Sequence, residues 1–181
     1  MCYEIILQAY GFEKGWSLLT RLCANVKRFG ESGGNAPQEV AAGEVAAGMV
    51  IDQYAQTVID SVGPDALALV LPKGTTVIGA DSIGVLKGAP ARELANLFVR
   101  FALADEGQRV LFQPVGANGQ KHALHRLPVR RALYDEPQAP RTRPYEYQSD
   151  FQYDEQKGSF RWQIVNDLVG LWLIEAHADL A

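Results

Sequence analysis

The sequence has little cysteine and no long apolar run, and both absences exclude classes of protein. Two cysteines, Cys2 and Cys23, are too few for a disulfide scaffold and lack the CxxC spacing of zinc or thioredoxin-type sites. We expect both to be small buried residues, with a single bridge between them as the alternative. No apolar run approaches the roughly 20 residues that span a bilayer, and we find no export signal in the chain. What is left is a globular protein.

Catalytic signatures are also missing, because the sequence contains no GxSxG, HExxH, GxGxxG or GxxxxGK[ST] motif. The net charge is −4, from 17 basic and 21 acidic residues among 181. This balance argues against a general binder of nucleic acid or acidic membranes. His122 and His125 lie in a basic stretch bounded by prolines, where solvated side chains are the simplest interpretation.

Charge is unevenly distributed, since no lysine or arginine occurs between Phe29 and Pro72. The acids of this segment are Glu31, Glu39, Glu44, Asp52, Asp60 and Asp65. Carboxylate and phenolate oxygens suit ferric iron and other hard cations, and with a tyrosine ring they also suit organic ammonium groups. A solvated acidic face without a ligand is the alternative.

The hydrophobic spacing predicts alternating helices and strands, and therefore an α/β fold. Two helices broken near Gly11 to Gly15 fill the first 29 residues, and a short helix follows an Asn35 N-cap. A proline-rich surface connection spans 114–144, and a closing helix spans Phe160 to His177, with Trp162, Leu168 and Trp172 covering a surface. The predicted strands are Ala46 to Ile51, Ala66 to Leu71 and Thr75 to Leu86, and further helices are predicted over 52–63 and 92–103.

Two segments are candidates for ligand contacts. The glycine-rich segment Glu31 to Gly34 precedes a helix, so its backbone could approach a ligand closely, although a plain turn is the alternative. A strand that ends at Ile51 would place Asp52, Gln53 and Tyr54 at the carboxyl edge of a sheet, where ligands collect. The predicted ligand contacts are Ser32, Gly33, Gly34, Asp52, Gln53 and Tyr54.

The order of four sequence blocks resembles the later part of bacterial ABC-importer solute-binding proteins of the ferric-iron type. The blocks are GFEKGWSLLTRLCAN from Gly11, VAAGEVAAGMVIDQYA from Val40, the P-x-G of Pro72 to Gly74, and DSIGVLKGAPARELANLFVRFALADEGQ from Asp81. The resemblance implies a type II periplasmic-binding-protein fold with mostly parallel sheets and flanking helices. The two-lobed fold would be incomplete, with only its C-terminal part present.

The family's chain path implies three segments. Residues 1–66 would form part of the second lobe, residues 67–105 would return to the first lobe, and residues 106–181 would form a C-terminal connection and closing helix. By this resemblance the full-length protein is periplasmic or extracytoplasmic, binds a small solute without catalysis, and delivers it to an ABC permease in the inner membrane. No nucleic-acid partner and no resident cofactor are expected.

The resemblance also bears on the solute. In ferric-iron members two adjacent tyrosines bind the metal, and this sequence has Gln53 and Tyr54 at the matching positions. Tyr54 could contribute to a ferric-iron site, but an organic solute held by hydrogen bonds fits equally well. Two other hypotheses stay open: a truncated remnant without binding activity, and an enzyme fragment that uses Cys23 or His122.

Overall fold

The computed structural model describes residues 2–147 and 151–181, and about half of the chain is helical. Within the described ranges there is no strand and no sheet, so the predicted α/β fold with a mostly parallel sheet is wrong. In chain order the elements are α1 (Cys2–Tyr10), α2 (Phe12–Cys23), α3 (Asn35–Ala41), α4 (Asp52–Val62), α5 (Arg92–Leu103), α6 (Asp105–Arg109), the 3₁₀ turns η1 (Ala117–Gly119) and η2 (Arg131–Asp135), α7 (Glu155–Leu168), the π-helix η3 (Val169–Glu175) and α8 (His177–Leu180).

The three predicted strand segments are irregular instead. A strand is stable only when a neighbouring strand takes up its N–H and C=O groups and another layer covers its apolar face. In the described part of the chain these segments pair with no strand, and Val70 and Leu86 are 73% and 83% exposed. The apolar side chains of these segments therefore do not form the buried face of a sheet.

The chain divides into two compact units, which we describe separately. Unit 1 comprises Met1–Val50, Leu69–Val77 and Gln148–Ala181, and unit 2 comprises Ile51–Ala68 and Ile78–Tyr147. The assignment of residues 1–66, 67–105 and 106–181 to parts of two lobes stays a prediction.

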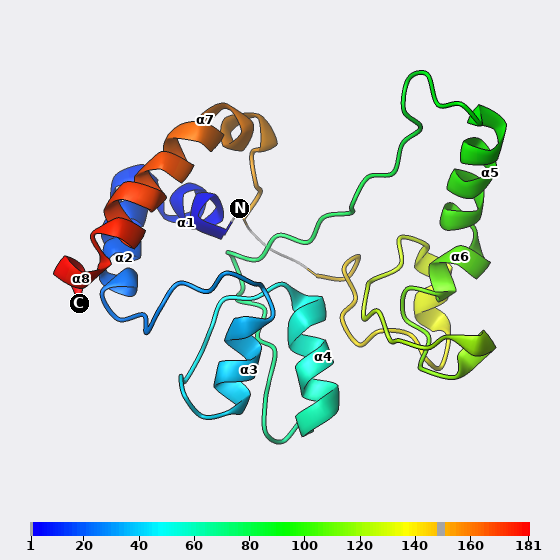
Figure 1. Cartoon of the computed structure of the whole chain (residues 1–181), viewed down its shortest axis with the longest axis horizontal. Coiled ribbons are helices and arrows are strands. Elements are labelled where there is room, and N and C mark those ends of the chain that lie inside the picture. The colour runs from blue at the N-terminus through cyan, green and yellow to red at the C-terminus, as the bar shows by residue number, and fades with distance from the viewer. Residues whose placement is uncertain (1, 148–150) are drawn as a thin grey trace. The chain divides into compact units, whose positions relative to one another are not determined.

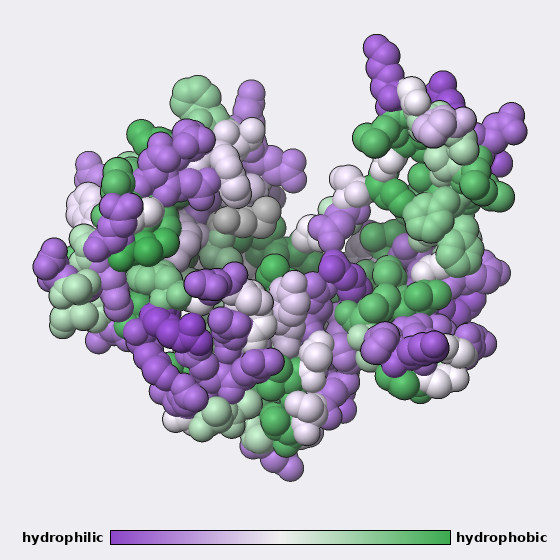
Figure 2. All heavy atoms as spheres, in the orientation of Figure 1, coloured by the Kyte–Doolittle hydropathy of each residue, from purple (hydrophilic) through white to green (hydrophobic). Residues whose placement is uncertain are grey.

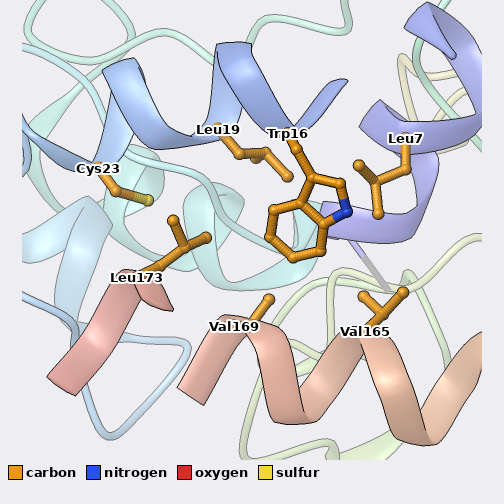
Figure 3. Packing of buried hydrophobic residues seen from close by; sticks show 7 residues of the cluster. All are labelled: Leu7, Trp16, Leu19, Cys23, Val165, Val169 and Leu173. Atoms are coloured by element: carbon orange, nitrogen blue, oxygen red, sulfur yellow. The ribbon is translucent and has the colours of Figure 1, made fainter. Parts of the chain in front are cut away.

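The core of unit 1 lies between the N-terminal helix pair α1 and α2 and the C-terminal helices α7 and η3 (Figure 1). Gly11, with φ at +84°, makes the turn between α1 and α2 as predicted. Gly15 then allows the two helices to approach, since a Cβ there would lie 2.9 Å from Cα of Leu7. Figure 3 shows the packed cluster, which comprises Leu7, Trp16, Leu19, Cys23, Val165, Val169 and Leu173.

The closing helix begins earlier than predicted and changes its winding. Asp154 caps α7 by accepting a hydrogen bond from the backbone N–H of Lys157 at 2.8 Å. The π-helix η3 continues α7 and keeps Val169 and Leu173 buried, and the Trp172 ring stacks on Trp16 with centroids 6.3 Å apart. Of the three residues predicted to cover a surface, Leu168 is half-buried and packs on the core, whereas Trp162 is 55% exposed.

Unit 2 has a smaller core, in the segment predicted to be only a surface connection. Leu133 and Tyr134 of η2 are buried, and the Tyr134 hydroxyl donates to the carbonyl of Pro128 at 2.9 Å. Gln108 of α6 donates to the carbonyl of Ala102 and accepts from the N–H of Val129, at 2.6 and 2.7 Å. Proline-rich sequence therefore contributes to packing here.

Helix α5 confirms the predicted helix over 92–103, but none of its residues is buried. Its apolar side chains are on the surface, as the hydrophobic atoms along this helix in Figure 2 show. The most exposed are Leu94, Leu97, Phe98 and Phe101. An amphipathic helix without a covering layer marks a surface that is prone to association.

Candidate functional site

The loop that contains Ser32, Gly33 and Gly34 lies in unit 1, directly before α3. Ser32 stabilises the loop locally, because its carbonyl accepts from the N–H of Asn35 at 3.1 Å and its hydroxyl accepts from the N–H of Gly34 at 3.4 Å. Gly34 has φ at −83°, and Asn35 is the first helical residue and not the N-cap. The loop is an exposed turn with ordinary backbone angles, so its glycines are not required for a left-handed conformation.

Asp52, Gln53 and Tyr54 form the first turn of α4 in unit 2. They do not lie at a strand edge, because the expected strand before them is absent from the described structure. Oδ1 of Asp52 accepts the backbone N–H of Gln53 at 2.9 Å, and the Tyr54 side chain is exposed. Successive helical positions point about 100° apart, so these three side chains leave the helix in different directions, and their contact with a single ligand stays a prediction.

The structure thus brings the six predicted residues together as two local groups. Ser32, Gly33 and Gly34 share one loop of unit 1, and Asp52, Gln53 and Tyr54 share one helical turn of unit 2. A common ligand site formed by both groups stays a prediction.

The acidic segment is less negative than its sequence suggests, because two of its glutamates pair with cations that precede it. Lys27 forms an ion pair with Glu44, and Arg28 forms one with Glu39. The hydrogen bond and charge of Lys27 hold the pKa of the Glu44 carboxyl below its ordinary value. The case for a cationic ligand is weaker as a result.

A metal site has no cluster to support it in the described ranges. Among residues 2–147 and 151–181 no group of three or more His, Cys, Asp or Glu side chains is placed to hold a metal ion. The hypothesis of bound ferric iron rests on Tyr54 alone, and the role of Tyr54 in metal binding stays a prediction.

The two cysteines differ, and the prediction that both are buried is wrong for Cys2. Both are free thiols, and Cys2 is exposed whereas Cys23 belongs to the unit 1 core. Burial raises the pKa of the Cys23 thiol, which disfavours the nucleophilic thiolate. The hypothesis of an enzyme that uses Cys23 thus loses support.

A cavity that the sequence did not indicate lies in unit 2. Its volume is about 330 Å³, and its walls are Val110, Gln113, Asn118, Gly119, Gln120, Lys121, His122 and Leu124. A second cavity of about 550 Å³ lies near the start of α5, beside the exposed side chains of Lys87 and Arg92. Residues 107–134 contain no acidic residue, but this charge pattern does not by itself indicate a cavity.

None of the helices in the described ranges combines the length and the apolar character needed to cross a membrane.

Comparison with known proteins bears directly on the predicted family. The profile of the bacterial extracellular solute-binding protein family matches residues 7–137. The chain is 26% identical over 136 residues to the "Phosphoglycerate transport regulatory protein PgtC" of Salmonella typhimurium strain LT2, and equally to the protein of that name from Salmonella typhi. Each alignment covers 75% of this chain and 31% of the relative, so the chain spans about a third of these curated proteins.

No solved structure shows significant similarity to the chain. The family profile nevertheless covers well over half of the 181 residues, including α2 to α6 and the cavity of unit 2. The chain therefore belongs to the bacterial extracellular solute-binding protein family.

Proposed function

We propose that this chain is part of the solute-binding component of an ABC importer, which captures a small solute between two lobes and delivers it to a permease in the inner membrane. The observation that carries the proposal is the family match over residues 7–137. A second support is that the name of the Salmonella relatives refers to transport. The proposed action is reversible capture without catalysis, outside the cytoplasm and without a nucleic-acid partner.

We propose a small organic molecule as the solute, with ferric iron as the second candidate. Gln53 stands where a ferric-iron site would have its first tyrosine, so one phenolate, that of Tyr54, is left. The pairing of Glu39 and Glu44 with Arg28 and Lys27 lowers the negative charge that favoured a cation. The name of the relatives also refers to phosphoglycerate, an organic molecule.

In this proposal the first turn of α4 and the loop before α3 contact the solute. Tyr54 has an exposed ring and hydroxyl, and the half-buried Gln53 offers an amide that can both donate and accept hydrogen bonds. Ser32, Gly33 and Gly34 offer a hydroxyl and backbone N–H groups from the exposed loop. Two-sided capture means that this chain alone binds weakly, because each side supplies only part of the interactions.

The test is a calorimetric titration of the chain with 3-phosphoglycerate and, separately, with ferric citrate. Tyr54→Phe removes one hydroxyl and should weaken binding of 3-phosphoglycerate about two- to twelvefold, which corresponds to about 0.5–1.5 kcal/mol for one net hydrogen bond. Tyr10→Phe is the matched control, since Tyr10 is also an exposed helical tyrosine, located in unit 1.

The two candidate solutes give different outcomes. An organic solute predicts no visible tyrosinate-to-iron absorption band with ferric citrate. A strong band that disappears in Tyr54→Phe would favour iron. Unchanged affinity together with a lower melting temperature in Tyr54→Phe would make Tyr54 a structural residue and contradict its role in binding.

A further inference from the structure

The cavity of about 330 Å³ in unit 2 is formed by a loop with a fixed conformation. Gln113 is 8% exposed and donates its amide N–H to Oε1 of Gln120, while its own Oε1 accepts from Asn118 at 3.2 Å. Nε2 of Gln120 lies within hydrogen-bonding distance of the carbonyls of Val110 and His122, at 3.1 and 2.8 Å. These amide contacts hold both ends of the loop together and shape the cavity wall before any ligand arrives.

The charge around this cavity is one-sided. Residues 107–134 contain no aspartate or glutamate, although they contain five lysines and arginines and two histidines. Three of the arginines form ion pairs with carboxylates: Arg109 with Glu136 at 2.9 Å, Arg126 with Asp81 at 3.0 Å and Arg130 with Asp105 at 2.6 Å. Nε2 of His125 lies 3.5 Å from a carboxylate oxygen of Asp60. The guanidinium of Arg131 lies 4.5 Å from the ring centroid of Tyr145.

Lys121 and His122 are the exceptions. Both side chains are exposed, neither forms an ion pair with a described residue, and both line the cavity. Three arginines of this segment therefore pair with carboxylates and Arg131 lies over a ring, whereas the Lys121 ammonium and the His122 imidazole line the cavity. An ammonium beside amide groups suits an oxyanion, because charge-assisted hydrogen bonds are stronger than neutral ones.

We propose that this cavity binds the carboxylate or phosphate group of a small organic anion, with Lys121 as the principal charge contact. The imidazole of His122 offers a second N–H donor. Val110 and Leu124 line the cavity and can contact the carbon skeleton of a small molecule. The proposal goes beyond the proposed function, because none of the six predicted solute contacts lines this cavity.

The test follows backbone amide shifts of the 181-residue chain by NMR while inorganic phosphate and then succinate are added at low salt. Both probes should shift amides within residues 110–124, and the probe whose titration curve gives the lower dissociation constant is the preferred oxyanion. Lys121→Gln should weaken binding of the preferred probe about tenfold, the effect of one charge-assisted hydrogen bond. Lys14→Gln is the control, since Lys14 is an exposed lysine of α2 in unit 1 that forms no ion pair with any residue the structure describes.

Three outcomes would overturn the proposal: no shift within 110–124 with either probe, equal binding by Lys121→Gln and the unmodified chain, or equal weakening by Lys14→Gln, which would indicate a general charge effect. Unchanged amide spectra of the ligand-free variants show that folding is preserved. The result is independent of the Tyr54 titration, because Tyr54 does not line the cavity.

Discussion

Arg161 of α7 donates a hydrogen bond to the carboxylate of Glu4 in α1 at 2.5 Å, across 157 positions of the sequence. The Glu4 side chain is 4% exposed and that of Arg161 is 19% exposed, so the pair is largely removed from water. Arg161 also lies 5.2 Å above the ring of Phe12. Oε1 of Glu4 also accepts from Nε2 of Gln8 at 2.8 Å, whereas Oε2 of Glu4 and Nε of Arg161 are buried without a hydrogen-bond partner in the described structure, so the Arg161 guanidinium is the cation that balances this carboxylate.

Removing Arg161 should therefore strongly destabilise unit 1. Arg161→Ala leaves the buried Glu4 carboxylate without its cation, which should lower the free energy of unfolding by about 3–5 kcal/mol in urea titrations. Arg21→Ala, at an exposed position of α2, is the control. The double variant Glu4→Leu with Arg161→Met should recover most of the loss, and a double variant as unstable as Arg161→Ala would contradict this explanation.

Two leucines of η3, one buried and one exposed, allow a controlled test of how the C-terminal helix packs. Leu173 is fully buried and Leu171 is 62% exposed. Leu173→Ala should lower the free energy of unfolding by about 2–5 kcal/mol, because it leaves a cavity among α1, α2 and α7. Leu171→Ala should change it by less than about 0.5 kcal/mol. Equal effects in thermal or urea unfolding would mean that η3 does not pack on the N-terminal helices.

Among the glycines of unit 2, Gly107 has the least room for a side chain. A Cβ at this position would lie 2.1 Å from the carbonyl oxygen of Phe101, a backbone atom that cannot move without distorting the end of α5. We expect Gly107→Ala to cost at least about 1–3 kcal/mol and to speed amide hydrogen exchange in α5 and α6. Gly84→Ala, where nothing lies within 4 Å, should leave exchange unchanged.

Tyr134 should make stability depend on pH in the alkaline range. Burial, and secondly the neighbouring Tyr145, raise the pKa of Tyr134 from 10.0 to about 12. The folded state therefore favours the neutral phenol, so this contribution is fully present below pH 10 and is lost as the pH rises from 10 to about 12. The stability difference between the unmodified chain and Tyr134→Phe, measured by urea unfolding at several pH values, should change across that window. A constant difference would show that Tyr134 ionises as easily as an exposed tyrosine.

The uncovered face of α5 should drive self-association of this chain. Leu97 is 62% exposed and Phe98 is 60% exposed, and no residue of the helix is buried. Leu97→Glu should reduce the apparent mass in light scattering with little change in stability, because the substitution affects an exposed apolar surface. Ser17→Glu adds the same charge at an exposed position of α2 and should leave association unchanged. Equal effects of both variants would indicate simple charge repulsion.

The sequence predicted the helices well, because helical signals are local. The apolar spacing around Trp16 and Leu19, the turn at Gly11 and the helices from Asp52 and Arg92 follow from residues within a few turns of each other. The family could also be predicted from the sequence, because the four sequence blocks between Gly11 and Gln108 lie inside the region that matches the family profile.

Long-range features depended on the tertiary structure. A short apolar run such as Ala46 to Ile51 has strand character, but a strand forms only when another segment pairs with it, and the described structure provides no such pairing. No local pattern places Arg161 beside Glu4, or shows that Lys121 and His122 line a cavity while the nearby arginines find partners. The ion pairs join residues that are distant in sequence, so the path of the whole chain decides them, and the cavity depends on how the loop of 110–124 folds back on itself.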